Sequence, residues 1–225
     1  MSDALNEFLI RGVAHNIGFL AALMAHPRFI EGRISTDLIA EEYPDGFHAQ
    51  DLAPDNPKLL VAVAAAVHLA YQHRAALISG QIPGHKRVVG EDWMVLLGDE
   101  SFAVNAVMDD DSYRVTLGRE TLVVETAWKL GEVLFQGSLN DAPFCLQVER
   151  TAIAYRLIHG GAESDVLVMN PQAATLQALM PEKIAADTSK SLLSPMPGLL
   201  VSVAVSEGQA IKAGDELAVV EAMKM

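Results

Sequence analysis

The chain has 225 residues, 51% of them hydrophobic, a proportion that excludes an intrinsically disordered protein and allows one large or two small domains. Its 29 acidic residues outnumber 16 basic ones and give a net charge of −13, so we expect the surface to repel nucleic acid and anionic lipid. A single cysteine, Cys145, excludes an intramolecular disulfide framework and fits a reducing compartment, either the cytoplasm or an organelle matrix.

The first 50 residues predict helices that have no obvious apolar partner of their own. Apolar residues recur near a period of 3.6 over residues 3–26, which predicts one helix that stops at Pro27. Ser35 or Thr36 can cap a second, short helix that runs through residue 42 and is closed by a Pro-Asp-Gly turn. No basic region followed by a short apolar core opens the chain, so we do not expect a secretory signal.

A long helix without a polar side is predicted over residues 57–79. Asn56 suits its N-cap, and Pro57 suits its first position because proline has no amide hydrogen to leave unpaired there. Apolar residues and alanines occupy every side of the first four turns, and such a helix must be surrounded by protein. The longest apolar stretch, residues 59–69, is interrupted at His68 and is well short of the roughly 20 residues that a membrane span needs.

Residues 92–169 switch to short alternating or β-branched runs, which are typical of strands. Glycine, asparagine and aspartate separate these runs, as in tight turns, and no helical pattern intervenes. We therefore predict an α+β fold in which an eight-stranded antiparallel barrel wraps the preceding helix. The predicted strands are 93–97, 102–108, 113–117, 121–128, 132–136, 144–149, 153–158 and 165–169.

After the barrel, residues 181–193 lose both periodicities and predict a linker. A third unit opens with Ser-Pro-Met-Pro-Gly at 194–198 and continues as strands at 199–205 and 216–221, with glycine turns between them. It is followed by Ala222-Met223-Lys224-Met225, which places the Lys224 amine where the chain would turn into a hairpin. Such an amine is open to acylation by a modifying enzyme, whereas the bare tripeptide would also suit a solvated lysine beside two core methionines.

These C-terminal motifs resemble the first half of a biotinyl domain, in which a lysine on the hairpin between two quasi-symmetric halves carries biotin through an amide. The resemblance implies that Lys224 is the attachment site. The biotinylation motif that it implies consists of Glu221, Ala222, Met223, Lys224 and Met225. Lipoyl domains share the half-barrel pattern, but their lysine is usually flanked by Asp and Ala, which disfavours a lipoyl carrier.

The resemblance extends over the rest of the chain. Four segments, 1–5, 10–16, 26–29 and 43–47, are similar to the end of the biotin carboxylase domain in propionyl-CoA carboxylase alpha subunits. The helix and barrel resemble the BT domain of those subunits. The implied division is a carboxylase remnant at 1–50, a BT domain at 51–180, a linker at 181–193 and a truncated carrier domain at 194–225.

The resemblance implies the biotin-carrying and beta-subunit-docking part of an acyl-CoA carboxylase. In that family, ATP and bicarbonate carboxylate biotin, and a carboxyltransferase beta subunit then passes the carboxyl group to propionyl-CoA, which gives methylmalonyl-CoA. ATP, Mg and bicarbonate belong to a biotin carboxylase domain that this chain lacks, because it has neither a glycine-rich phosphate loop nor a suitable glutamate cluster. We therefore expect no catalytic residue and no metal site here.

The expected partners are the beta subunit and a biotin protein ligase, with no nucleic acid and no membrane. The expected compartment is the bacterial cytoplasm or the mitochondrial matrix. Residues 43–47 favour propionyl-CoA, but methylcrotonyl-CoA and acetyl-CoA carboxylase alpha subunits remain alternatives because the beta subunit selects the substrate. The family continues past Lys224, so the chain is expected to be a fragment, and a scaffold that is never biotinylated is the alternative from a different class.

Overall fold

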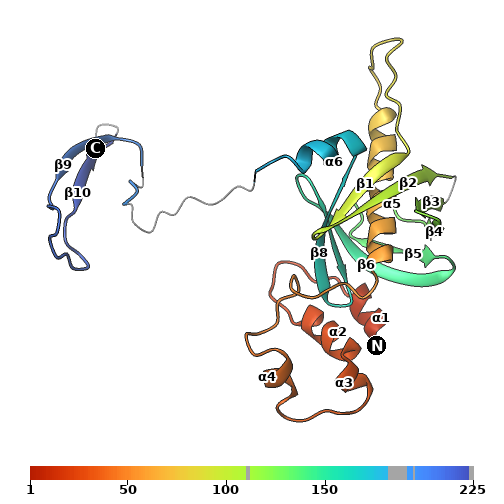
Figure 1. Ribbon diagram of the computed structural model, residues 1–225, viewed down its shortest axis with the longest axis horizontal. Helices are drawn as coiled ribbons and strands as arrows, with labels where there is room; N and C mark the ends of the chain where they lie inside the picture. Colours follow the sequence, from red (N-terminus) through yellow and green to blue (C-terminus); the bar gives the residue numbers. More distant parts are fainter. Residues whose placement is uncertain (110–111, 182–191, 195, 223–225) are drawn as a thin grey trace. The chain divides into compact units, whose positions relative to one another are not determined.

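Helix α5, Pro57–Ala76, is the axis of the larger unit of the protein, shown in the computed structural model of Figure 1. The structure describes residues 1–109, 112–181, 192–194 and 196–222. The Asn56 side chain accepts a hydrogen bond from the Leu59 amide at 3.1 Å and so caps the helix, with Pro57 at the first position as predicted. Every residue from 59 to 67 is buried. The predicted apolar helix is therefore confirmed.

The helix ends at Ala76, three residues before the predicted end. The side-chain amide of Gln81 donates to the carbonyls of Ala76 at 2.6 Å and Ile78 at 3.0 Å. These bonds satisfy carbonyl groups that a further helical turn would have used. Gly80 then takes a φ of +83°, a left-handed conformation that turns the chain out of the helix.

Eight strands form a closed antiparallel barrel around α5, because β1 pairs with both β2 and β8. Closure leaves no free strand edge, and it confirms the predicted fold class. The strands are β1 Asp92–Leu97, β2 Glu100–Met108, β3 Ser112–Leu117, β4 Glu120–Thr126, β5 Leu134–Leu139, β6 Ala142–Arg150, β7 Tyr155–His159 and β8 Ala162–Met169.

The predicted boundaries between β4 and β5 are wrong by about two residues. The Thr126 hydroxyl donates to the Gln136 carbonyl at 2.6 Å and accepts from the Trp128 amide at 3.1 Å, which takes the chain out of the ladder after Thr126. The indole of Trp128 then donates to the Glu132 carbonyl at 2.8 Å. Residues 127–133 are consequently a loop, although the predicted strands extended to residue 128 and resumed at residue 132.

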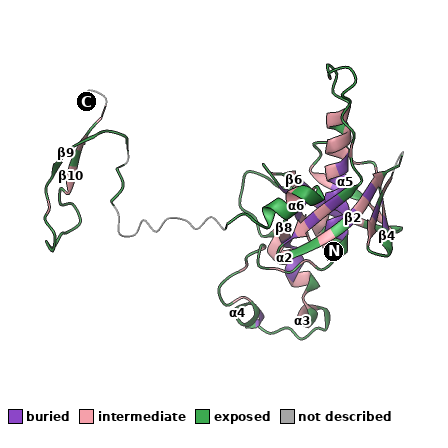
Figure 2. Cartoon of the chain, turned by 45° about the horizontal axis from the view of Figure 1, so that its top comes forward, coloured by how far each residue is buried: buried purple, intermediate pink, exposed green. Residues whose placement is uncertain are grey.

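The barrel core consists of inward side chains that alternate along the strands and contact α5. No buried polar or charged residue is found in the part of the chain that the structure describes. The fully enclosed residues include Val61, Val63, Val67, Val95, Val115, Val124, Phe135, Leu146, Leu157 and Val166. Figure 2 shows buried residues along α5 and along the strands around it.

The N-terminal segment departs from the single helix predicted over residues 3–26. Two helices form instead, α1 Ser2–Glu7 and α2 Ile17–Ala25, because Gly12 adopts a φ of +84° and the Phe8 carbonyl accepts a hydrogen bond from Gln147 of β6 at 3.0 Å. Packing on the barrel therefore overrides the helical periodicity.

Proline and capping residues determine where the other short helices begin and end. Pro27 stops α2 as predicted, but it also begins α3, Pro27–Ile30, which the sequence pattern did not indicate. Helix α4, Leu38–Glu42, confirms the second short helix, with Asp37 at the N-cap position in place of Ser35 or Thr36. A further helix that was not predicted, α6 Pro171–Gln177, follows β8 and is capped by Asn170, which accepts from the Ala173 amide at 2.7 Å.

Helices α1 and α2 are held against the turn between β7 and β8. The Asn6 side chain accepts a hydrogen bond from the Gly160 amide at 3.0 Å. A Cβ atom on Gly161 would lie 2.3 Å from the Gly18 carbonyl oxygen, so α2 can approach this closely only because a glycine occupies the turn. Residues 1–180 therefore form one compact unit, and residues 181–225 form another.

We predict that Val63→Asp abolishes cooperative folding of the larger unit. Val63 is 0% exposed, and an unpaired buried carboxylate costs several kcal/mol, which is comparable with the roughly 5–15 kcal/mol that stabilise a domain. Val88→Asp is the matched control, because Val88 is 88% exposed. Thermal unfolding followed by circular dichroism should show a lost transition for Val63→Asp alone. An unchanged Tm in Val63→Asp would contradict the enclosed helix.

Candidate functional site

The smaller unit contains the strand that leads to the predicted attachment lysine. Strands β9 Leu199–Val203 and β10 Ala218–Glu221 form an antiparallel pair whose register shifts between Val219 and Val220. Glu221 is exposed and Ala222 half-buried, while Met223, Lys224 and Met225 lie outside the described residues. The structure thus places the first two residues of the predicted motif at the end of an extended strand.

Gly198 fits closely against the end of β10. A Cβ atom at this position would lie 2.4 Å from the Glu221 carbonyl oxygen and 2.7 Å from a methyl carbon of Val220. Any larger residue would push the two strands apart just before the predicted attachment residue. Gly198 therefore has a packing role at this site.

Two turns of similar construction connect β9 to β10, as the sequence predicted. Gly208 and Gly214 have φ values of +80° and +100°, and both lie in turns that a side chain closes. The Gln209 side chain accepts from the Ser206 amide at 3.0 Å, and the Asp215 side chain accepts from the Lys212 amide at 2.8 Å. These bonds stabilise each turn locally.

The strand pair leaves much apolar surface open. All five residues of β9 are exposed, and four of them are aliphatic, namely Leu199, Leu200, Val201 and Val203. An isolated two-stranded hairpin is marginally stable in water, and apolar surface of this kind marks a site that another segment covers.

A second exposed apolar surface lies on the segment between α5 and β1, residues 77–91, which we call the crown loop. It projects beyond the barrel at the end opposite α2 and α3 (Figure 1). Leu77 is 82% exposed, Ile82 70% and Val88 88%. Three exposed basic or imidazole residues, His85, Lys86 and Arg87, follow each other in this loop of an otherwise acidic protein. The loop therefore combines apolar and basic groups on one projection.

His68 lies where α5 leaves the barrel, below the crown loop. Its ring packs edge-on against Trp93 with the ring centroids 4.6 Å apart, and it contacts Tyr155 in the same manner at 5.9 Å. Burial lowers the pKa of His68 from 6.5 to about 4, and the charges of Arg150 and Arg87 act in the same direction. The imidazole is therefore neutral near pH 7. Both ring nitrogens of His68 have hydrogen-bond partners, namely the Gln72 side chain and the Tyr155 hydroxyl.

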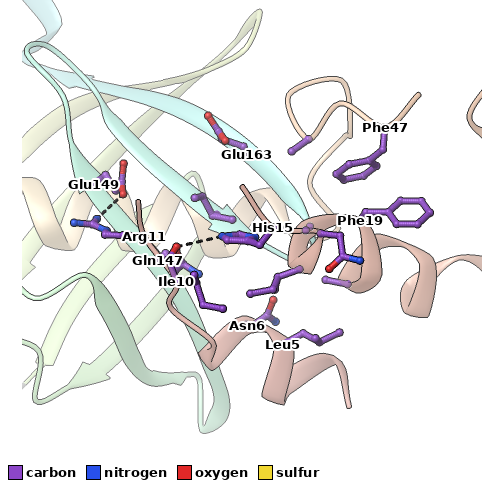
Figure 3. Close-up of a pocket in the computed structure, with 17 residues that line it drawn as sticks. Leu5, Asn6, Ile10, Arg11, His15, Phe19, Phe47, Gln147, Glu149 and Glu163 are labelled. Carbon is purple, nitrogen blue, oxygen red and sulfur yellow. Dashed lines mark hydrogen bonds and ion pairs between the residues drawn. The ribbon is translucent and has the colours of Figure 1, made fainter. Parts of the chain in front are cut away.

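A cavity of about 350 Å³ separates α1 and α2 from β6 and β8 (Figure 3). Its charged groups already have partners, since Arg11 pairs with Glu149 at 2.5 Å and Glu163 pairs with Arg156 at 3.1 Å. The His15 imidazole lies 3.2 Å from the Ile10 carbonyl oxygen. The ion-paired groups that line this cavity are therefore already engaged.

Cys145 is buried in β6. Its sulfur lies 3.8 Å from the Asn6 carbonyl oxygen, and burial raises the pKa of the thiol, so the nucleophilic thiolate is disfavoured. Within the described ranges, no three His, Cys, Asp or Glu side chains gather as a metal site would require. In the same part of the chain, none of the helices combines the length and apolar character that crossing a membrane requires.

Comparison with known proteins matches two parts of this chain to protein families. Residues 60–183 match the family described as "Propionyl-coenzyme A carboxylase BT domain" and residues 190–225 the family described as "Biotin-requiring enzyme". A propionyl-CoA carboxylase alpha chain from Ruegeria pomeroyi is 40% identical over 226 residues, covering 100% of this chain and 33% of the relative.

More distant relatives match over the same extent. The mitochondrial propionyl-CoA carboxylase alpha chain of Mus musculus is 34% identical, covering 100% of this chain and 32% of the relative. A mitochondrial methylcrotonoyl-CoA carboxylase subunit alpha from Dictyostelium discoideum is 24% identical, covering 100% of this chain and 34% of the relative. The chain spans about a third of the length of these curated relatives.

We predict that His68 makes the larger unit less stable in acid. Its pKa in the folded state, about 4, lies below the ordinary 6.5, so between these values the unfolded chain binds a proton that the folded chain does not. This contribution is fully present above pH 6.5 and is lost as the pH falls to 4, by up to about 3 kcal/mol. Urea unfolding at pH 4 to 7 should show a shallower pH dependence for His68→Gln. His85→Gln, in the exposed crown loop, is the control, and equal slopes for both variants would contradict the assignment.

Proposed function

Because this chain belongs to the propionyl-CoA carboxylase BT domain family, we propose that it is the biotin-carrying and docking part of an acyl-CoA carboxylase alpha subunit. The observation that carries the proposal is the succession, in one chain, of a helix-filled BT barrel and a segment that matches biotin-requiring enzymes. Propionyl-CoA is the proposed substrate of the complete enzyme, because the relatives named for it are more similar than the methylcrotonoyl-CoA relative.

Lys224 is the residue that we propose to carry biotin, attached by a biotin protein ligase through an amide on Nζ. Support comes from the described part of the motif, in which β10 runs extended to an exposed Glu221 and Gly198 keeps the neighbouring strand close. These features fit a modified side chain near the end of β10, because Glu221 is exposed there. Bound biotin would supply the group that takes up and releases a carboxyl group.

The tether accounts for the contribution of Lys224 to the reaction. A carrier that is covalently held visits two sites without being released, so its effective concentration at each site depends on reach and not on diffusion from bulk solution. The amide also removes the positive charge of the lysine. The residues of this chain thus bind and deliver the group, while the chemical steps belong to other domains of the proposed complete enzyme.

We assign docking of the carboxyltransferase beta subunit to the crown loop. Its apolar residues supply area that is poorly covered by the chain itself, and an exposed apolar patch with a polar rim is typical of an interaction site. Its basic residues stand against a net charge of −13, so the loop favours an acidic rim on the partner. The rigid barrel beneath supports the loop at both ends, through α5 and β1.

We predict that Lys224→Arg abolishes avidin binding by the protein purified from its native cells, because the guanidinium cannot form the amide. The helix and barrel lie in the other unit, so thermal unfolding should be unchanged. Lys212→Arg, in a turn of the same unit, is the control and should keep avidin binding. Avidin binding retained by Lys224→Arg would refute the attachment site. If mass spectrometry found lipoate on the Lys224 peptide, the chain would be a lipoyl carrier and not a biotin carrier.

We also predict that Val88→Asp weakens binding of the purified beta subunit by about tenfold or more, because the partner would have to desolvate a carboxylate within an apolar contact. Ile30→Asp introduces the same group at another exposed apolar position, in α3 at the other end of the unit (Figure 1). Titration calorimetry should find that only Val88→Asp raises the Kd. Equal affinities of both variants and the wild type would place the docking surface elsewhere.

A further inference from the structure

Four side chains form a continuous line of hydrogen bonds from the base of the crown loop into the mouth of the barrel. The Arg87 guanidinium donates to the side-chain oxygen of Gln72. The Gln72 side-chain nitrogen lies 2.9 Å from Nε2 of His68, and Nδ1 of His68 lies 3.0 Å from the Tyr155 hydroxyl oxygen. The line therefore joins the loop to α5 and α5 to β7.

Every hydrogen bond in this line has its donor on the Arg87 side and its acceptor on the Tyr155 side. An arginine can only donate, so the amide oxygen of Gln72 faces Arg87 and its NH2 group donates to Nε2 of His68. Since Nε2 accepts, the imidazole proton resides on Nδ1 and is donated to the Tyr155 oxygen. Only one neutral tautomer of His68 fits, and this agrees with the suppressed protonation of the buried ring.

The inner end of the line is fixed by the barrel. Trp93 and Tyr155, which flank the His68 ring, are 8% and 6% exposed. Tyr155 also stacks on Tyr71 with the ring centroids 6.2 Å apart, and Arg150 lies over the Tyr71 ring at 4.4 Å. His68 and Gln72 are thus oriented by packed neighbours before any partner binds.

The outer end of the line holds the crown loop at a second point. The backbone amide of Arg87 donates to the Gln81 side-chain oxygen at 3.1 Å, and the Gln81 amide group holds the end of α5. Arg87 is consequently bound through both its side chain and its backbone. The apolar residues Ile82 and Val88 of the crown loop are exposed and add little to hold the loop.

We propose that Gln72 and His68 are positioning residues, which hold Arg87 and thereby pre-order the crown loop for docking. The inference rests on the docking function proposed above and names what makes that surface competent. A loop with few buried contacts loses conformational entropy when it binds, and a loop ordered in advance avoids part of that cost. The two residues act through Arg87 and do not themselves need to contact the partner.

The test compares two substitutions of Gln72, neither of which alters a loop residue. Gln72→Leu removes both hydrogen bonds at constant charge. Gln72→Glu keeps an acceptor for Arg87 and can also accept from Nε2 of His68, so the ring proton should move from Nδ1 to Nε2, or the ring should bind a second proton at Nε2. Hydrogen exchange of residues 78–89, nitrogen NMR of the imidazole, and the Kd for the purified beta subunit are measured for both, with Val88→Asp as the surface variant.

We expect Gln72→Leu to accelerate exchange in the loop and to raise the Kd, each by about tenfold, as the loss of one or two hydrogen bonds implies. Thermal unfolding of the barrel should show it still folded. Gln72→Glu should restore both loop protection and affinity, while NMR reports the moved proton. If Gln72 had a purely structural role, Gln72→Glu would not restore loop protection and affinity together with a change of the His68 tautomer.

Two results would overturn the inference, and they differ from a failure of the docking proposal. If Gln72→Leu leaves loop exchange unchanged, the line does not order the loop. If Gln72→Leu loosens the loop without changing the Kd, while Val88→Asp raises it, the docking surface stands and its pre-ordering is refuted. If Val88→Asp also leaves the Kd unchanged, the docking proposal itself fails and the inference fails with it.

Discussion

The enclosure of α5 by a closed sheet is the constraint on which the larger unit depends. A helix satisfies its own backbone hydrogen bonds, and a closed barrel satisfies those of its strands, so each can contact the other entirely through apolar side chains. Nine consecutive helical residues, 59–67, are buried in this way. Since the helix cannot be stable in water and the barrel cannot remain empty, each element requires the other.

The two ends of this barrel are built on different chemistry. At one end, α2 approaches the β7–β8 turn so closely that Gly161 is required, and the contact is made largely by backbone. At the other end, polar and aromatic side chains around His68 close the mouth, and the chain projects from it as the crown loop. Close backbone packing suits a fixed junction, whereas side-chain hydrogen bonds suit a surface that is exposed and yet ordered. The exposed apolar and basic residues on which the docking proposal rests project from the His68 end.

The proposed carrier and docking roles lie on separate units, residues 181–225 and 1–180. The barrel gains its stability from a dry core, while the β9–β10 pair leaves aliphatic residues open on a strand pair that buries little. The proposed docking role requires a rigid unit, whereas the proposed carrier role requires a side chain that can reach other sites. Two separate units allow the chain to meet both requirements. The division also means that the biotin chemistry can be tested without disturbing the barrel.

Local patterns in the chain were sufficient for the capped apolar helix at residue 57, the antiparallel strands that surround it and the glycine turns at Gly208 and Gly214, because periodicity and turn chemistry act over a few residues. Resemblance singled out Lys224, and its attachment role stays a prediction. Local patterns failed where distant groups compete for the backbone: β6 draws residues 8–16 out of the expected helix, and Thr126 turns the chain before Trp128. The line from Arg87 to Tyr155 joins residues that are far apart in the sequence, so only the folded chain could bring them together.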